Sequence, residues 1–240
     1  MSAAPLASAG PSVYWYLTRS TGAVALLLLT LAVALGVIEV QRWSTPRWPR
    51  FVVDSLHRSV SLLAMAFLAV HILTSVLDSF APIALADAFI PFAGAYRPFW
   101  LGLGAVSFDL LLAVTVTSLL RRRLGFTGWR TIHWLTYASW PIALVHGLGT
   151  GSDVKSAWLL WLSIACAALV VAAVAARALI GWRGSGGRRG AALGAAAAFS
   201  LFLVLWLPGG PLGREWPRRS GTPASLLTGH PSASSTAAER

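Results

Sequence analysis

Histidine is the residue type in this sequence best suited to do chemistry, and four of its five copies lie in long apolar stretches. His57 and His71 lie fourteen residues apart in one stretch, and His133 and His146 lie thirteen apart in another. At a rise of about 1.5 Å per residue, each pair would span about 20 Å along a helix axis. Imidazole is a common axial ligand of haem iron, and helical bundles bind cofactors between facing helices. If the two helices face each other, one histidine from each helix would lie at each of two depths. Each depth could then hold one haem, near one of the two membrane surfaces.

The rotation of the histidines around their helices is a second constraint. Fourteen residues leave His57 and His71 about 40° apart, on one face, whereas thirteen residues leave His133 and His146 about 140° apart. Pro141 lies between the latter two and removes a backbone hydrogen bond, so a kink or local rewinding is expected there. Zinc fits less well than haem, because the two pairs lie too far apart in height to share one ion.

Two other functions are open for these histidines. In a transporter or proton pathway they would be relay groups together with Asp109, and no chromophore would be bound. In a structural or assembly subunit they would only be packed polar residues. Ionisable residues inside a membrane are rare, and four of them in matched pairs favour haem ligation. The inverted repeats typical of many transporters are not evident in the sequence.

The elements that must position the histidines are expected to be membrane-spanning helices. Of the 240 residues, 56% are hydrophobic and 11% are charged, whereas about 25% are charged in soluble domains. The polar residues gather in short breaks between long apolar runs, which is typical of a chain surrounded by lipid. The predicted fold class is all-α, an integral membrane bundle of about six transmembrane helices with haem sites between helices two and four. The expected spans are 13–39, 52–79, 98–120, 129–149, 156–181 and 191–207.

Three regions are expected along the chain. Residues 1–12 form a short N-terminal segment, residues 13–207 form the transmembrane haem domain, and residues 208–240 form a disordered polar tail. Cys166 is the single cysteine and lies in an apolar run, so neither a disulfide nor a Cys-ligated metal site is expected. Residues 184–187 are rich in glycine but follow an apolar span instead of a strand, so they are not expected to bind a dinucleotide.

Positive charge predicts the orientation of the bundle in a cell membrane. The net charge is +11, and twelve basic residues fall on one side of the expected spans: Arg42, Arg47, Arg50, Arg58, Arg121, Arg122, Arg123, Arg130, Arg177, Arg183, Arg188 and Arg189. That side should be cytoplasmic, with both termini outside. Three arginines after the sixth span (Arg214, Arg218 and Arg219) would then lie outside, against the rule. A nucleic-acid partner is not expected, because the basic residues lie at span ends and no soluble domain presents a basic face.

The histidine pattern resembles that of ferric reductase-like transmembrane domains, which are shared with the NADPH oxidases and the haem subunit of the periplasmic methionine sulfoxide reductase system. The resemblance covers roughly residues 14–180 and rests on His57-x13-His71 and His133-x12-His146. The stretch WRTIHWLTYASWPIALVHGLGTG, residues 129–151, is similar to short actinobacterial members in particular. The resemblance implies that His57 with His133 bind an inner haem b, that His71 with His146 bind an outer one, and that electrons move outward.

The expected function is therefore that of a di-haem b-type transmembrane electron-transfer protein. It would be an oxidoreductase of the ferric reductase-like class or the electron-transfer subunit of one. Full-length ferric reductases and NADPH oxidases continue into a cytosolic flavin- and nicotinamide-binding module, and no such module is recognisable in these 240 residues. The electron donor is expected to be separate, either a cytosolic flavoprotein dehydrogenase or a quinol. The extracytoplasmic acceptor would be ferric iron or a flavin-bearing protein.

Three arginines and one carboxylate are candidates to support the haems. Arg58 and Arg130 near the inner pair, and Arg19 near the outer start of the first span, could bind haem propionates through bidentate contacts. Cytoplasmic anchoring explains Arg58 and Arg130 equally well, and Arg19 could simply extend to the membrane surface. Asp109, in the middle of the third span, could accept a hydrogen bond from a ligand histidine and raise its basicity. Protonation or pairing with an arginine is the alternative for this carboxylate.

Overall fold

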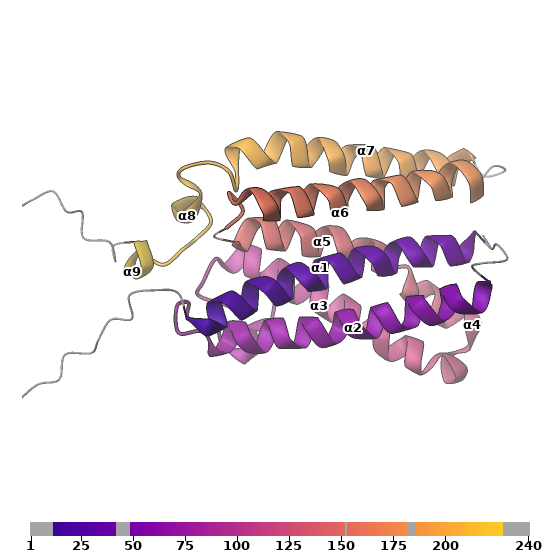
Figure 1. The fold of residues 1–240 in the computed structure, drawn as a ribbon, viewed down its shortest axis with the longest axis horizontal. Helices are drawn as coiled ribbons and strands as arrows, with labels where there is room; N and C mark the ends of the chain where they lie inside the picture. The colour runs from indigo at the N-terminus through magenta and orange to yellow at the C-terminus, as the bar shows by residue number, and fades with distance from the viewer. Residues whose placement is uncertain (1–11, 42–48, 152, 182–185, 228–240) are drawn as a thin grey trace, which may run out of the picture. The chain divides into compact units, whose positions relative to one another are not determined.

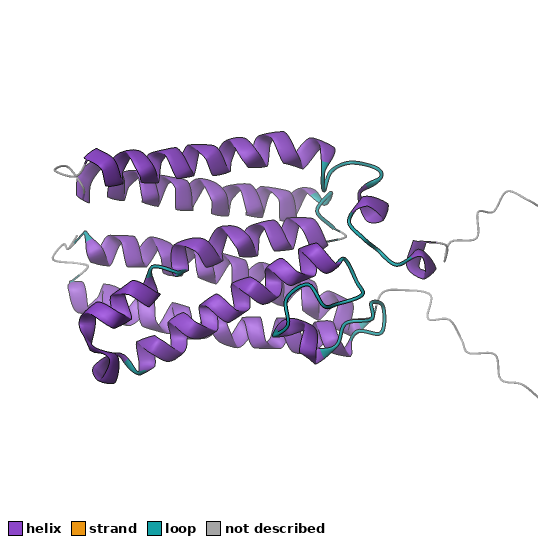
Figure 2. Ribbon diagram, turned by 180° about the vertical axis from the view of Figure 1, so that it is seen from behind, coloured by secondary structure: helices purple, strands orange, loops and turns teal. Residues whose placement is uncertain are grey.

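The described part of the protein consists of helices and loops, with no strand in it (Figure 2). The computed structural model describes residues 12–41, 49–151, 153–181 and 186–227. In chain order the elements (Figure 1) are α1 (Val13–Val40), α2 (Arg50–Leu77), η1 (Leu85–Ala88), α3 (Pro98–Leu119), α4 (Arg121–His133), α5 (Thr136–Thr150), α6 (Ala157–Ala176), η2 (Arg177–Gly181), α7 (Gly186–Gly209), α8 (Trp216–Arg219) and α9 (Ala224–Leu227).

Five of the described helices are long and apolar enough to cross a membrane. They are α1, α2, α3, the stretch Ala157–Ile180 that includes α6, and α7. In the most apolar 18 residues of each helix, at most 28% are buried inside the protein. Most of this apolar surface is therefore left to contact lipid. The prediction of an all-α membrane bundle is confirmed, and the protein is a multi-pass membrane protein.

The span expected at 129–149 is not one continuous helix. Helix α4 ends at His133 and α5 begins at Thr136, and α5 has only 15 residues. Between them the backbone N–H groups of residues 135, 137 and 138 donate to carbonyls three residues back, at distances of 2.9–3.1 Å. Pro141 lies inside α5, where it has no N–H for the carbonyl of Tyr137 and its ring crowds that oxygen, so it weakens the first turn of α5 next to the break.

This break brings the two histidines of the second pair closer to a common face. A 3₁₀ turn rotates the chain by about 120° per residue, against about 100° in an α-helix, so three such residues add about 60°. The angle between His133 and His146 falls from about 140° to about 80° as a result. The structure therefore contains the expected local rewinding, and by these ideal helix angles it leaves His133 and His146 about 80° apart, short of a common face.

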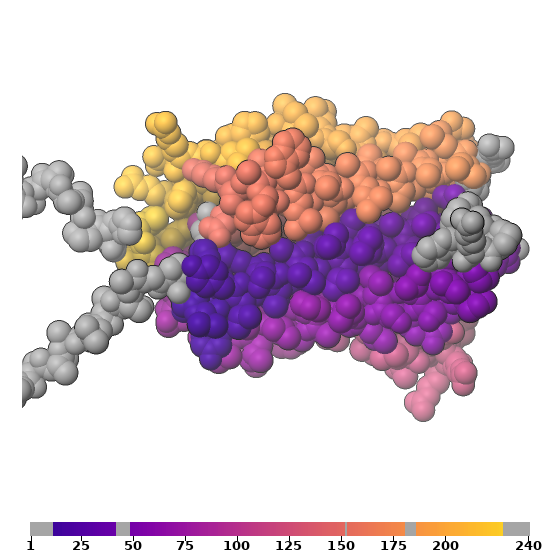
Figure 3. Space-filling model, in the orientation of Figure 1, coloured from indigo at the N-terminus to yellow at the C-terminus, as the bar shows by residue number. Residues whose placement is uncertain are grey.

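The chain divides into two compact units, the first made of residues 12–80 and 164–192 in the described part. Helices α1 and α2 run antiparallel along each other in this unit, as Figure 3 shows in indigo and violet to magenta. The hydroxyl of Thr18 donates to Thr74 Oγ1 at 3.1 Å, and Ser12 Oγ donates to Asp78 Oδ1 at 2.8 Å. Alanine and threonine recur among the buried residues of α1, and such small side chains let two helices approach closely.

The second unit is made of residues 81–163 and 193–227 in the described part. Helices α3 and α5 pack antiparallel in it, and the buried Ser107 Oγ donates to the carbonyl of Ser139 at 3.0 Å. Helix α4 also packs against α3, and Trp129 Nε1 donates to Ser118 Oγ at 3.1 Å.

The C-terminal residues 208–227 are folded, where the sequence predicted a disordered tail. They include α8 and α9, and Trp216 is buried with 6% of its surface exposed. Its indole Nε1 donates to the carbonyl of Gly149 at 3.0 Å, which ties this segment to the end of α5. The predictions for the two termini also concern residues 1–11 and 228–240, which lie outside the described residues. Residues 184 and 185 of the glycine-rich segment 184–187 lie outside them too.

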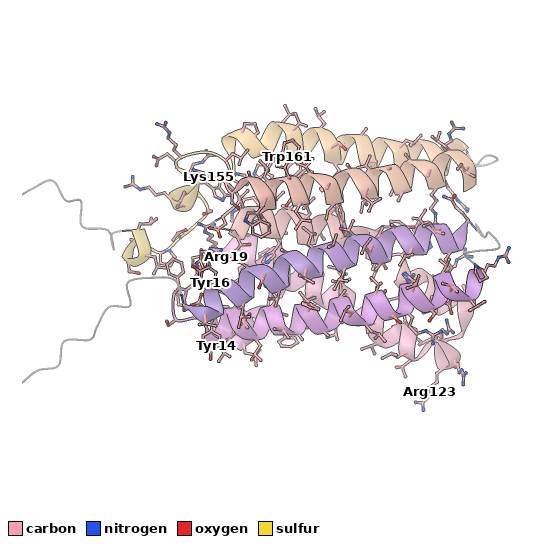
Figure 4. The ribbon with its side chains drawn as sticks, in the orientation of Figure 1. Tyr14, Tyr16, Arg19, Arg123, Lys155 and Trp161 are labelled. Carbon is pink, nitrogen blue, oxygen red and sulfur yellow. The ribbon has the colours of Figure 1, made fainter. Side chains whose placement is uncertain are left out.

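The orientation of the second unit can be tested with single cysteines. Arg123 and Lys155 are exposed and lie at opposite ends of this unit (Figure 4). In a Cys166→Ser background, an Arg123→Cys variant should react with a membrane-impermeant maleimide only after the cell membrane is opened. A Lys155→Cys variant should react in intact cells. Labelling of Arg123→Cys in intact cells would show that the orientation predicted from positive charge is wrong.

Candidate functional site

Both histidines of α2 face α1, as their fourteen-residue spacing predicts. Nδ1 of His57 lies 3.0 Å from the carbonyl oxygen of Ala32, and Nδ1 of His71 lies 2.8 Å from that of Thr18. A carbonyl oxygen can only accept, so Nδ1 must be the protonated nitrogen in each ring. The lone pair of a neutral imidazole is then on Nε2, which is the form that binds a metal.

A glycine beside each ring makes this approach possible. A Cβ atom added to Gly22 would lie 3.0 Å from Cε1 of His71, and one added to Gly36 would lie 3.3 Å from Cε1 of His57. Each glycine comes four residues after the carbonyl that accepts the hydrogen bond. In a helix that carbonyl already binds the N–H of the glycine, and its second lone pair is reachable when no side chain covers it. Gly22 and Gly36 are fourteen residues apart, like the histidines they contact.

His146 has the same environment in the second unit. Its Nδ1 lies 2.8 Å from the carbonyl oxygen of Trp100 in α3. Four residues on, a Cβ atom added to Gly104 would lie only 2.5 Å from Cε1 of the His146 ring. Real side chains essentially never come that close, so only glycine fits beside this ring. Three histidines on two different helix pairs thus share one arrangement, a carbonyl beneath the ring and a glycine one turn later.

His133 is held differently. It is the last residue of α4, and its ring lies 5.0 Å from that of Trp129, one turn earlier. Trp129 is itself fixed by its hydrogen bond to Ser118 of α3. Residues 105–124 contain no glycine, so α3 cannot offer His133 the glycine contact that it offers His146.

The donor set suits a group that needs two protein ligands. No three His, Cys, Asp or Glu side chains come together in the described ranges, as a structural zinc site would require. A haem iron takes two axial ligands. A histidine whose Nδ1–H is bound by a backbone carbonyl is suited to this role, because its tautomer is fixed and Nε2 is left for the iron. The residues present therefore fit the expected haem ligation, while the pairing of α2 histidines with those of α4 and α5 stays a prediction.

The three candidate arginines lie in different surroundings. The guanidinium of Arg19 lies 3.6 Å from the ring centroid of Trp15, and Arg19 directly follows Thr18, whose carbonyl binds His71. Figure 4 shows it near the N-terminal end of α1. Arg58 is exposed and forms an ion pair with Asp54 at 3.2 Å. Arg130 is exposed, with its guanidinium 5.8 Å from the ring of Phe126. Of the three arginines, Arg19 is the half-buried one, and it is next in sequence to Thr18, which binds His71.

Asp109 does not hold any of the three well-defined histidines. Backbone carbonyls accept from Nδ1 of His57, His71 and His146, so the position foreseen for a carboxylate is already filled. Asp109 is half-buried and lies about 180° around α3 from Trp100, whose carbonyl holds His146. The other two roles predicted for Asp109, a protonated carboxyl group or a partner of an arginine, stay predictions.

The glycines and their carbonyl partners were missed in the sequence, although a signal was present. The distance between Gly22 and Gly36 equals that between His57 and His71. Such a match is expected when two antiparallel helices repeat one contact at both ends.

Comparison with known families matched residues 21–144, just over half of the chain, to the family described as ferric reductase like transmembrane component. The matched range includes His57, His71 and His133, and it ends two residues before His146. No curated protein and no solved structure matched the chain.

Alanine at the three glycines should destabilise the protein in the order of the contacts. Gly104→Ala should be the most destabilising, on the order of 1–3 kcal/mol, because the new methyl group would force the His146 ring aside. Gly22→Ala should come next and Gly36→Ala last. The measurement is the temperature at which a maleimide dye reacts with Cys166, which is buried in the folded protein.

Gly194→Ala is the matched control, since nothing lies within 4 Å of a Cβ atom at this helical position. It should be neutral or slightly stabilising, because alanine favours a helix over glycine by about 0.5–1 kcal/mol. Equal effects at Gly104 and Gly194 would contradict the steric explanation.

Proposed function

Because the chain belongs to the ferric reductase-like transmembrane family, we propose that it transfers electrons across the cell membrane through two b-type haems. The observation that carries this proposal is the arrangement shared by His57, His71 and His146. In each, a carbonyl fixes Nδ1 as the donor and leaves Nε2 as a ligand. A histidine that only packed in a membrane core would also need one hydrogen-bond acceptor, but it could use either ring nitrogen, whereas all three histidines use Nδ1 and keep Nε2 for a ligand.

In the proposed protein, His57 and His133 hold the inner haem, and His71 and His146 hold the outer one. When bound, the haems supply the one-electron redox chemistry. The hydrogen bond from each Nδ1 orients the imidazole ring and makes Nε2 a better electron donor to iron. Fourteen residues of α2 separate the two ligands by about 21 Å, which is most of the hydrocarbon thickness of about 30 Å.

The arginines have unequal roles in this proposal. Arg19 is half-buried beside the outer ligand contact, and its guanidinium is proposed to neutralise a propionate of the outer haem. Arg58 and Arg130 are exposed on the basic side of the protein. We propose that they bind those propionate groups of the inner haem that extend to the cytoplasmic membrane surface.

The donor and the acceptor follow from the proposed orientation. The basic side faces the cytoplasm, where a flavoprotein dehydrogenase or a membrane quinol would supply electrons. Ferric iron or a flavin-bearing protein would receive them on the opposite side. The protein is then either a reductase itself or the membrane subunit of one.

A proton-relay or transport function has less support from the same contacts. A relay histidine must exchange protons at both ring nitrogens. The Nδ1 atoms of His71 and His146 are instead held by carbonyls, which cannot take up a proton.

A reduced-minus-oxidised visible spectrum, with haem quantified by pyridine haemochrome, tests the proposal. The wild type should show a b-type spectrum with about two haems per chain, and His71→Ala should retain about one, because each haem needs both axial ligands. His230→Ala is the control, since this histidine belongs to neither pair, and it should retain both haems. A folded protein that stays colourless after haem supplementation would overturn the proposal and favour a proton relay.

A further inference from the structure

The C-terminal segment of the second unit packs around the residues that hold His146. We call Arg97 together with Trp206, Trp216, Gly221 and Thr222 the C-terminal clasp. Three of its members contact the last turn of α5 or the first turn of α3. Nothing in the sequence pattern of the histidines requires such a structure, and residues 206–222 lie outside the range matched by the family.

Arg97 is the centre of the clasp. It is buried, with 3% of its surface exposed, and its backbone has φ 42°, a left-handed conformation that is rare outside glycine. Nη1 donates to the carbonyls of Gly149 and Thr150 at 3.2 and 2.9 Å, and Nε donates to Thr222 Oγ1 at 2.9 Å. The backbone N–H of Arg97 donates to the carbonyl of Gly221 at 3.1 Å. The cation thus binds the free carbonyls at the negative end of α5.

Trp100 connects the clasp to His146. Its carbonyl accepts the hydrogen bond from His146, while its ring is stacked on Trp206 at 5.1 Å and lies 4.9 Å from Trp216. A Cβ atom added to Gly149 would lie 2.2 Å from the Trp100 ring, so the end of α5 presses directly on this indole. The Nε1 of Trp216 donates to the carbonyl of that same Gly149.

Thr150 is a second connection between the clasp and the ligand. Its carbonyl accepts from Arg97, and its hydroxyl donates to the carbonyl of His146 and lies 3.2 Å from His146 Nδ1. The ring and the backbone of His146 are therefore both linked to groups that the clasp holds.

We propose that Arg97 and Trp216 are positioning residues for His146, so that the C-terminal segment is part of the outer haem site. The inference rests on the proposed function. By fixing Trp100 and the end of α5, the clasp fixes the ring plane of His146 and the strength of its Nδ1 hydrogen bond. Both properties tune the electron donation of an axial histidine and with it the midpoint potential of the haem. All members of the clasp lie in the second unit, where they surround the residues that hold His146, so the inference predicts an effect on the outer haem alone.

Thr222→Val, Trp216→Phe and Arg97→Met test this inference at increasing severity. Trp216→Phe keeps an aromatic ring but removes the hydrogen bond to Gly149, and Thr222→Val removes only one bond to Arg97. Amide hydrogen exchange at residues 147–151 should become about tenfold faster in Trp216→Phe, as expected for the loss of one hydrogen bond. In the haem-loaded protein, a redox titration should show one midpoint potential shifted and the other unchanged.

The controls match the variants in residue type. Trp161→Phe changes a tryptophan that is 68% exposed (labelled in Figure 4), and Arg214→Met changes an exposed arginine of the C-terminal segment. Both should leave hydrogen exchange and both potentials unchanged. Thr222→Val and Trp216→Phe decide the matter if Arg97→Met does not fold.

Two failures can be told apart. If the wild type holds two haems and neither potential moves in Trp216→Phe or Thr222→Val, the clasp only stabilises the fold and this inference is overturned, whereas the proposed function stands. A wild type that binds no haem would overturn the proposed function and the inference with it.

Discussion

The site depends on one interaction, the hydrogen bond from a histidine Nδ1 to a helix carbonyl left uncovered by glycine. In a lipid-surrounded bundle no water can replace a missing partner, so the N–H of each imidazole must find an acceptor within the protein. A carboxylate could serve, but burying its charge carries a penalty of several kcal/mol. A helix carbonyl has a second lone pair and is neutral, so it accepts the bond without a buried charge. Asp109 is consequently not needed for His57, His71 or His146.

This interaction also fixes how the helices pair. Thr18 and Ala32 can both reach their histidines only if α1 and α2 are antiparallel and in one register. A shift of one residue would rotate Gly22 and Gly36 by about 100° and place side chains against both rings. The small buried residues of α1 allow the close approach that a ring-to-backbone bond demands. Ligand geometry and helix packing are thus set by the same contacts.

The sequence was a good guide where the signal is local and a poor one where it depends on contacts between distant residues. Apolar runs predicted the long helices, and the fourteen-residue spacing predicted that His57 and His71 share a face. A kink or rewinding between His133 and His146 was predicted from Pro141, but neither its position before α5 nor its 3₁₀ hydrogen bonds were. The C-terminal segment has the composition of a tail, and it is folded because Arg97 binds Thr222, which is 125 residues away. No property of residues 208–227 taken alone predicts that bond.

The two ends of the second unit surround their histidines with different groups. His146 lies within a helix, with a carbonyl and a glycine beside its ring and the C-terminal clasp around its last turn. His133 is the last residue of the short helix α4, just before the two-residue turn that leads to α5, and its ring lies tilted at 34° to the ring of Trp129. An axial histidine whose ring is fixed and whose Nδ1 donates a strong hydrogen bond gives more electron density to its iron and lowers the potential of that iron. If two haems bind as proposed, these surroundings alone would make their potentials unequal.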